Sequence, residues 1–170
     1  MTNYIINLHK IDSLYNNFFF NVDDTFFSDF NNSEIRSGNI SVNLEIERKN
    51  ENFLFLFQLK GVVTNIMCDI CTENISLPVQ LSTNIIVQRT ERNLEDTDEI
   101  IYISRNENEI SIKQLLFELI TLSIPSKRTH EKKGKNSCNT EMIELLEKYA
   151  NKKSYYNDPR WETLRKLNIT

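Results

Sequence analysis

Two of the three cysteines in this 170-residue chain, Cys68 and Cys71, are separated by two residues in the segment MCDICTEN. Such a Cys-x-x-Cys turn can deliver two thiolates to one zinc ion, which proteins bind tetrahedrally through cysteine sulfur and histidine nitrogen. The third cysteine, Cys138, follows His130, which is one of only two histidines. Together these side chains would form a Cys₃His set. Because four protein ligands leave no open position for water or substrate, such a zinc site would be structural.

Two other interpretations of the cysteine pair stay open. A redox-active Cys-x-x-Cys usually opens a helix after a strand, where the helix dipole lowers the thiol pKa. The chain from Ile75 onward reads as a strand, which disfavours redox chemistry. The other alternative is a pair of buried thiols that bind no metal. The spacing from His130 to Cys138 is longer than in most zinc knuckles, although Gly134 permits a turn between them.

The elements around the cysteines are predicted by hydrophobic periodicity. Alternating apolar and polar residues predict strands over residues 4–8, 41–47, 53–63, 75–87 and 100–103. The polar segment 49–52 is a four-residue connection that suits a β-hairpin. The Cys-x-x-Cys turn therefore joins two strands at the tip of a second hairpin.

Six of the ten phenylalanines lie within residues 18–30, among asparagine and aspartate. Exposed aromatic rings can stack on nucleic-acid bases. Three aspartates and no lysine or arginine in the same cluster would repel phosphates. We therefore expect irregular chain here that packs its rings onto the sheet as a lid.

Helical spacing of apolar residues begins after residue 108. It predicts one helix over 112–122, ended by Pro125, and a second over 140–149. Asp158 and Pro159 suit the N-cap and first position of a last helix. The expected fold is α+β: a mostly antiparallel β-sheet, which could be curled or partly closed, followed by C-terminal helices packed at one side.

Charged residues are distributed unevenly along the chain. The net charge is −4, but residues 1–125 carry −9 and residues 126–170 carry +5. We expect a single domain in which residues 1–125 form an acidic, β-rich body with the Cys-x-x-Cys hairpin tip and one helix. Residues 126–170 would supply a basic loop and C-terminal helices packed on that body. The asymmetry favours an anionic partner for the basic part.

Several function classes find no support in the sequence. No stretch approaches the roughly 20 apolar residues of a membrane helix, and no secretory signal is recognisable. With so few cysteines, we expect a reducing cytoplasm as the compartment. The chain has only three glycines and none of the phosphate-loop, nucleophile-elbow or zinc-protease motifs. We therefore expect neither an enzyme nor a small-molecule substrate.

Four features occur in a defined order: a strand leading into CDIC, a further β segment, a helix ending in IPSKRTH before Cys138, and DPRWETLRKL. This combination resembles the YceD family, the large ribosomal RNA subunit accumulation proteins, in a form like that of Bacteroidetes members. The resemblance is strongest over residues 40–86 and 109–167. It implies a non-enzymatic role in accumulating large-subunit ribosomal RNA, as an assembly factor. That RNA or its precursor, and a ribosomal protein, would be the partners.

The resemblance also carries over residue by residue. The family's CxxC corresponds to Cys68 and Cys71. Its C-terminal signature corresponds to Asp158, Pro159, Arg160 and Leu164. Other members often have more cysteine around the position of His130 and Cys138, so a four-ligand site in this chain requires His130.

The basic C-terminal part supplies the candidate RNA contacts. They are Lys127, Arg128, Lys132, Lys133 and Lys135 in the loop, and Arg160, Arg165 and Lys166 near the end. Such side chains neutralise phosphates, so binding would weaken with salt. Trp161 would either stack on an unpaired base or anchor the last helix on the domain. Two rival functions stay open: an adaptor holding a basic ribosomal protein against the acidic body, and, more remotely, a metal-dependent RNA hydrolase.

Overall fold

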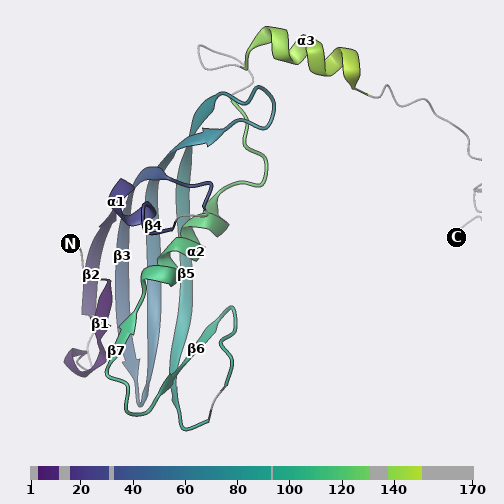
Figure 1. The fold of residues 1–170 in the computed structure, drawn as a ribbon. Coiled ribbons are helices and arrows are strands. Elements are labelled where there is room, and N and C mark those ends of the chain that lie inside the picture. The colour runs from purple at the N-terminus through teal and green to yellow at the C-terminus, as the bar shows by residue number, and fades with distance from the viewer. Residues whose placement is uncertain (1–3, 12–15, 31–32, 93, 131–137, 151–170) are drawn as a thin grey trace, which may run out of the picture.

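The computed structural model describes residues 4–11, 16–30, 33–92, 94–130 and 138–150 (Figure 1). Within this part of the chain, one large sheet has the strand order β2-β3-β4-β5-β6 and a small sheet pairs β1 with β7. The strands are β1 (Ile5–Asn7), β2 (Asn16–Val22), β3 (Ser37–Lys49), β4 (Asn52–Met67), β5 (Asn74–Thr90), β6 (Ile100–Ser104) and β7 (Glu109–Ser111). The helices are η1 (Leu8–Lys10, a 3₁₀ turn), α1 (Asp24–Phe27), α2 (Lys113–Ser123) and α3 (Thr140–Tyr149).

The α+β fold class predicted from the sequence is confirmed, with a sheet that is open rather than closed. Strands β2 to β5 form an antiparallel meander, whereas β6 runs parallel to β5, pairing Ile100 with Ile86. The first predicted strand exists as β1, but it belongs to the small sheet with β7. Among the described strands, pairing departs from antiparallel only at the β6 edge of the large sheet.

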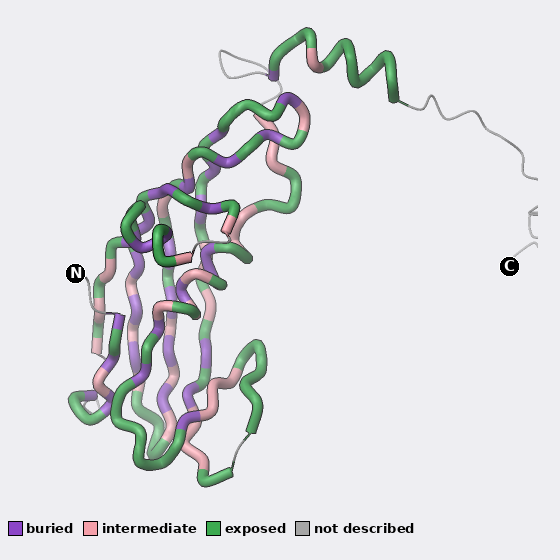
Figure 2. The backbone as a smooth tube through the Cα atoms, in the orientation of Figure 1, coloured by how far each residue is buried: buried purple, intermediate pink, exposed green. Residues whose placement is uncertain are grey.

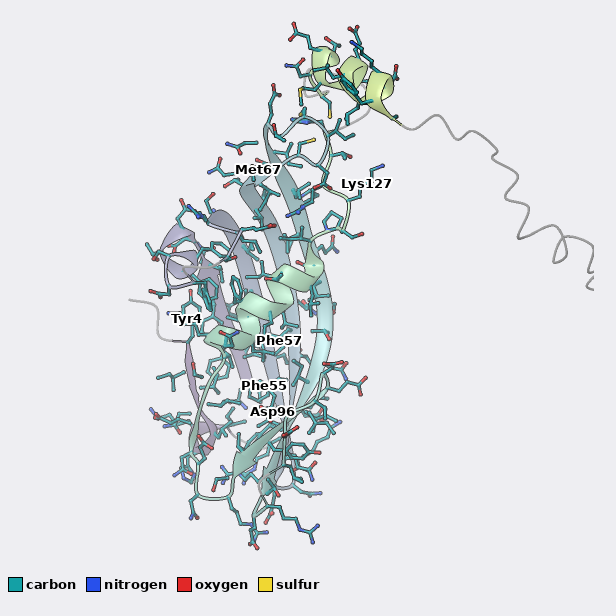
Figure 3. The ribbon with its side chains drawn as sticks, turned by 45° about the vertical axis from the view of Figure 1, so that its right-hand side comes forward. Tyr4, Phe55, Phe57, Met67, Asp96 and Lys127 are labelled. Atoms are coloured by element: carbon teal, nitrogen blue, oxygen red, sulfur yellow. The ribbon has the colours of Figure 1, made fainter. Side chains whose placement is uncertain are left out.

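One face of the large sheet carries the core. Strand β3 contributes four buried apolar side chains, those of Ile40, Val42, Leu44 and Ile46, and β4 contributes Phe53, Phe55, Phe57 and Leu59 among others. Their alternation with partly exposed or exposed positions can be followed along the strands in Figure 2. Helix α2 lies across this face and buries Leu116 and Ile120 (Figure 3). Each fully buried phenylalanine of this kind contributes about 2–3 kcal/mol of hydrophobic stabilisation.

The β3–β4 hairpin is tighter than the sequence indicates. Lys49 pairs with Asn52, so the turn contains only Asn50 and Glu51 rather than a four-residue connection. Asn50 has φ = 58°, in the left-handed region that asparagine adopts more readily than most residues. Lys49 and Asn52 thus form the last residue pair between strands β3 and β4.

The prediction of irregular chain in the phenylalanine-rich segment is wrong for its first half. Residues 16–22 form β2, in which Phe18 pairs with Leu44 and Phe20 with Val42. Phe19, between them, faces the other side and is 77% exposed. Three consecutive phenylalanines hide the period-two pattern of a strand, because both faces carry the same residue type.

The second half of that segment packs its rings into the core, as predicted. The side chain of Asp23 caps α1 by accepting hydrogen bonds from the N–H groups of Thr25 and Phe26. Phe26 and Phe27 of this helix are buried. The ring of Phe30 stacks on Phe117 of α2, with ring centroids 4.0 Å apart. These contacts tie α1 to α2 over the inner face of the sheet.

The two longer helices differ in burial. Helix α2 is part of the core, whereas α3 lies beyond the tip of the β4–β5 hairpin and has no buried residue (Figure 1). Neither of these helices, nor α1, has the length and apolar composition that crossing a membrane requires.

Candidate metal centre

The Cys-x-x-Cys motif forms the turn at the far end of the β4–β5 hairpin (Figure 1). The backbone N–H of Cys68 donates to the carbonyl oxygen of Glu73 at 2.9 Å, and the N–H of Thr72 donates to the carbonyl oxygen of Cys68 at 3.0 Å. The N–H of Ile70 points at the Sγ of Cys68, 3.4 Å away. The turn therefore presents the N–H group of Ile70 to the sulfur atom of Cys68, which stabilises a thiolate.

A β-bulge in β4 sets the direction in which Cys68 points. Val63 pairs with Leu77 and Ile66 with Ile75, so β4 contains one residue more than β5 in this interval. Asn65 in the bulge has φ = 58°, and its Nδ2 donates to the Oγ of Ser37 at 2.8 Å.

Side chains alternate along a strand, so one extra residue exchanges the two faces beyond it. Before the bulge, odd-numbered residues such as Val63 are buried. After it, Ile66 and Cys68 are buried, and Met67 is 65% exposed. The thiol of Cys68 is thereby turned toward the inner side of the sheet.

The segment that follows α2 is hydrogen-bonded to the hairpin tip. The N–H of Asp69 donates to the carbonyl oxygen of Arg128 at 2.7 Å, and the N–H of Arg128 donates to the Oδ2 of Asp69 at 2.6 Å. The guanidinium of Arg128 forms ion pairs with Glu34 at 2.6 Å and Asp69 at 3.5 Å. This network, which sequence reasoning missed, brings His130 to the tip.

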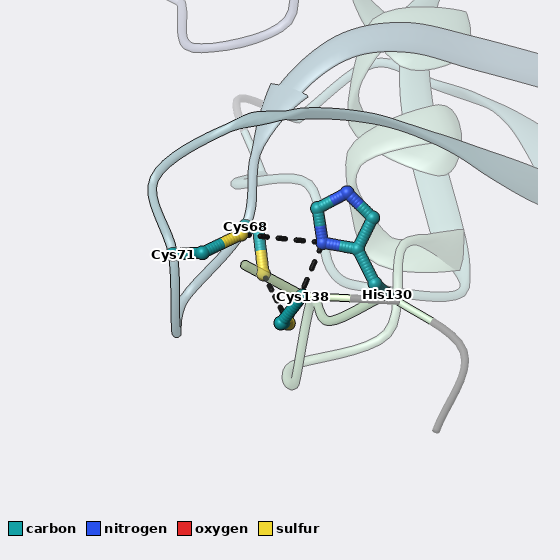
Figure 4. A group of neighbouring side chains, drawn as sticks. All are labelled: Cys68, Cys71, His130 and Cys138. Carbon is teal, nitrogen blue, oxygen red and sulfur yellow. Dashed lines mark hydrogen bonds between the residues drawn. The ribbon is translucent and has the colours of Figure 1, made fainter. Parts of the chain in front are cut away.

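All four residues predicted from the sequence as metal ligands come together (Figure 4). The Nδ1 of His130 lies 3.4 Å from the Sγ of Cys71 and 3.5 Å from the Sγ of Cys138. The Sγ atoms of Cys68 and Cys138 are 3.6 Å apart. The four donor atoms all lie within 4.8 Å of one another. The three cysteines are buried and His130 is partly buried.

These distances and donor types fit a tetrahedral zinc ion. With Zn–S bonds of about 2.3 Å, neighbouring sulfur ligands in a tetrahedron lie roughly 3.8 Å apart, close to the separations found here. Three thiols and one imidazole form a soft donor set that suits zinc better than magnesium or calcium. All three cysteines are free thiols. The arrangement therefore supports a metal site over an unmetallated pair of cysteines.

The thiols differ in their acidity. Burial raises the pKa of Cys68, but backbone N–H groups of Cys71, Ile70 and His130 and the imidazole outweigh burial and lower that pKa to about 6. Burial, together with the neighbouring thiols of Cys68 and Cys71, raises the pKa of Cys138 to about 11. At neutral pH the cluster thus holds at least one thiolate, while Cys138 retains a proton that a bound cation would displace.

The candidate RNA-contacting residues are only partly covered by the structure. Lys127 is exposed and lies at the same end of the molecule as Met67 (Figure 3). Arg128 is engaged by Glu34 and Asp69. The other predicted contacts lie outside the described residues: Lys132, Lys133, Lys135, Arg160, Trp161, Arg165 and Lys166. The same holds for Asp158, Pro159 and Leu164, so the RNA-contacting set stays a prediction.

Comparison with known proteins gives one match. The family model described as "Large ribosomal RNA subunit accumulation protein YceD" matches residues 56–168, which is more than half of the chain. The matched region starts within β4 and contains all four clustered ligands. Searches of curated proteins and of solved structures found no match.

Proposed function

The chain belongs to the YceD family of large ribosomal RNA subunit accumulation proteins, and we propose that it is a non-enzymatic factor that supports large-subunit ribosomal RNA accumulation and assembly. The observation that carries this proposal beyond the family is the cluster of four ligands at the hairpin tip. Two of those ligands come from the hairpin and two from the basic part of the chain, residues 126–170. The cluster therefore attaches the basic part to the acidic body.

In this proposal the metal is a structural zinc ion held by Cys68, Cys71, His130 and Cys138. When bound, it supplies a cross-link between the β4–β5 hairpin and the chain after α2. Hydrolysis by a metal ion needs a coordination position open to water. Because four protein ligands complete a tetrahedral shell, the donor set supports an architectural role over the RNA hydrolase.

RNA would be contacted by the basic part that the cluster attaches. Lys127, three residues before the ligand His130, has an exposed side chain, and more lysines and arginines follow in the sequence. The charge of Arg128 is compensated by Glu34 and Asp69, so we expect it to contribute less to RNA binding than Lys127. Ribosomes assemble in a reducing cytoplasm, where the three free thiols would stay reduced.

The adaptor function is the second candidate, favoured by one observation. Residues 1–125 carry a net charge of −9, which complements a basic ribosomal protein. In that case the acidic body would shield the ribosomal protein before its incorporation.

Salt-dependent binding to large-subunit ribosomal RNA tests the proposed function. We expect the intact protein to bind at low salt. The double variant Lys127→Glu with Lys132→Glu should bind roughly 10-fold more weakly, with the slope of log affinity against log salt reduced by about 1.4. The control double variant Lys10→Glu with Lys60→Glu makes the same change in net charge at exposed positions of the body, and should bind like the wild type.

Undetectable binding at low salt, or equal losses in both double variants, would refute specific contact through the basic part. Recovery of a ribosomal protein in a pull-down that withstands nuclease treatment would support the adaptor function instead.

A further inference from the structure

Helix α3 starts directly beside the metal centre. Cys138 contributes its Sγ to the cluster, and the next residue, Asn139, caps the helix by accepting the N–H of Glu141 at 3.0 Å. The direction in which the ten-residue helix leaves the hairpin tip is therefore set at its first turn. From there the helix extends away from the sheet (Figure 1).

Helix α3 has an apolar stripe that is partly buried at Met142, against the core, and exposed to solvent further along. Met142, Leu146 and Tyr149 follow one another at spacings of four and three residues, which places them on one face of an α-helix, with Leu145 beside them. Leu145 is 46% exposed, Leu146 48% and Tyr149 73%. The other face carries Glu141, Glu144, Glu147 and Lys148.

Such a helix is unstable without a partner. Isolated helices shorter than about 12–15 residues are marginal in water, and most of their stability in proteins comes from burial of an apolar face. Among the described residues, Lys148 of the same helix lies over the ring of Tyr149, 5.6 Å from its centroid, and no other element buries Leu145, Leu146 or Tyr149.

We propose that the chain's own C-terminal segment, residues 158–167 (DPRWETLRKL), covers the apolar stripe of α3. In this sequence Trp161, Leu164 and Leu167 recur every third residue, a spacing that gathers apolar side chains on one side of a helix. The pairing brings one indole and two leucines onto the exposed leucines and tyrosine of α3.

Charge complementarity distinguishes this segment from an arbitrary apolar partner. The polar face of α3 has three glutamates and one lysine: Glu141, Glu144, Glu147 and Lys148. The segment 158–167 has three basic and two acidic residues: Arg160, Arg165, Lys166, Asp158 and Glu162. Opposite charges beside the apolar contact fix the pairing of the two segments.

The linker between α3 and the segment 158–167 is long enough for this contact. Residues 151–157 leave seven positions between Ala150 and Asp158, and an extended chain of that length spans roughly 24 Å. Helix α3 is about 15 Å long, so the segment can return alongside it in the antiparallel direction. A tethered segment is present at an effective concentration of about millimolar, which favours it over a free partner. In that direction the end of the segment, with Arg165 and Lys166, returns toward the metal centre, whatever the role of these side chains in RNA binding.

The fluorescence of the full-length protein tests this, because Trp161 is the only tryptophan in the chain. We expect a blue-shifted emission maximum and weak quenching by acrylamide in the wild type. In Leu146→Gln the emission should shift to the red, and the quenching constant should rise about two- to threefold as the ring becomes accessible. Leu122→Gln is the matched control, since Leu122 is a 78%-exposed leucine on α2, away from α3. This control should leave both quantities unchanged.

Nuclear Overhauser contacts between the indole of Trp161 and the methyl groups of Leu146 would support the proposal directly. A wild-type tryptophan quenched as readily as N-acetyltryptophanamide would overturn it. An equal response in both glutamine variants would also overturn it, because the ring would then be buried elsewhere. Protection that disappears on dilution would replace the intramolecular contact with one to a second copy of the chain.

Discussion

Replacing Cys71 by serine tests whether the four-residue cluster holds a metal ion. The Sγ of Cys71 lies 3.4 Å from the Nδ1 of His130, and a serine hydroxyl of similar size is a poor zinc ligand at neutral pH. Structural zinc sites bind their ion with roughly 10–16 kcal/mol. Loss of one ligand in four removes about a quarter of that, or roughly 3 kcal/mol, which corresponds to about a hundredfold loss of affinity.

The assay is competition against a chromogenic zinc chelator, with elemental analysis of the purified protein. Met67→Ser is the control, because Met67 lies at the same hairpin tip but is exposed on the opposite face. We expect Met67→Ser to bind zinc like the wild type. We also expect Cys71→Ser and chelator-treated wild type to be cleaved faster by protease around residues 126–130. Equal zinc affinity in Cys71→Ser and wild type would refute the metal centre, as would a wild type that takes up no zinc.

Three further variants address the scaffold. Phe55→Ala empties a fully buried position and should lower the free energy of unfolding, measured by chemical denaturation, by about 3–5 kcal/mol. Phe19→Ala at an exposed position should change it by no more than about 0.5 kcal/mol. Similar losses in both variants would contradict the assigned faces of the sheet. Gly61→Ala would place a methyl group 2.6 Å from the Cα of Ile40 in the neighbouring strand. It should therefore destabilise the protein by about 3 kcal/mol or more. An unchanged melting temperature would argue against this strand register. Asp69→Ala removes the side-chain hydrogen bond and ion pair to Arg128, while the backbone N–H of residue 69 can still donate to Arg128. It should lower zinc affinity about 10-fold, because the histidine-bearing segment loses support at the hairpin tip. Unaltered affinity would show that the ligands orient themselves without that support.

The long hairpins could be predicted from the sequence because each strand is buried on one face. Val42 and Leu44 alternate with polar residues, so the local pattern already contains the information that the tertiary structure uses. Helix α3 has the bounds that were expected, from Thr140 to Tyr149, because its apolar spacing is purely local. The ligand set was also recoverable, since cysteine and histidine are rare in this chain and few other combinations exist.

The features that escaped prediction depend on distant contacts. The direction of β6 is set by its pairing with β5, and a five-residue strand carries no local signal for parallel or antiparallel pairing. The contact between Asp69 and Arg128 joins residues 59 positions apart, and one acidic and one basic side chain give no spacing to recognise. Strand β2 was not predicted because Phe18, Phe19 and Phe20 are identical in type, although Phe18 and Phe20 pack against the core and Phe19 is exposed to solvent.

The bulge at Asn65 makes the centre sensitive to an insertion or deletion in β4, in addition to substitution of its ligands. A relative of this protein that lacked one residue between Val63 and Ile66 could retain both cysteines, the histidine and the whole ladder of β4 and β5. Its Cys68 would nevertheless face away from His130, on the same side of the sheet as Phe19. In an alignment of relatives, the interval between the last buried β4 phenylalanine and the Cys-x-x-Cys motif should therefore distinguish chains that bind metal from chains that only preserve the motif.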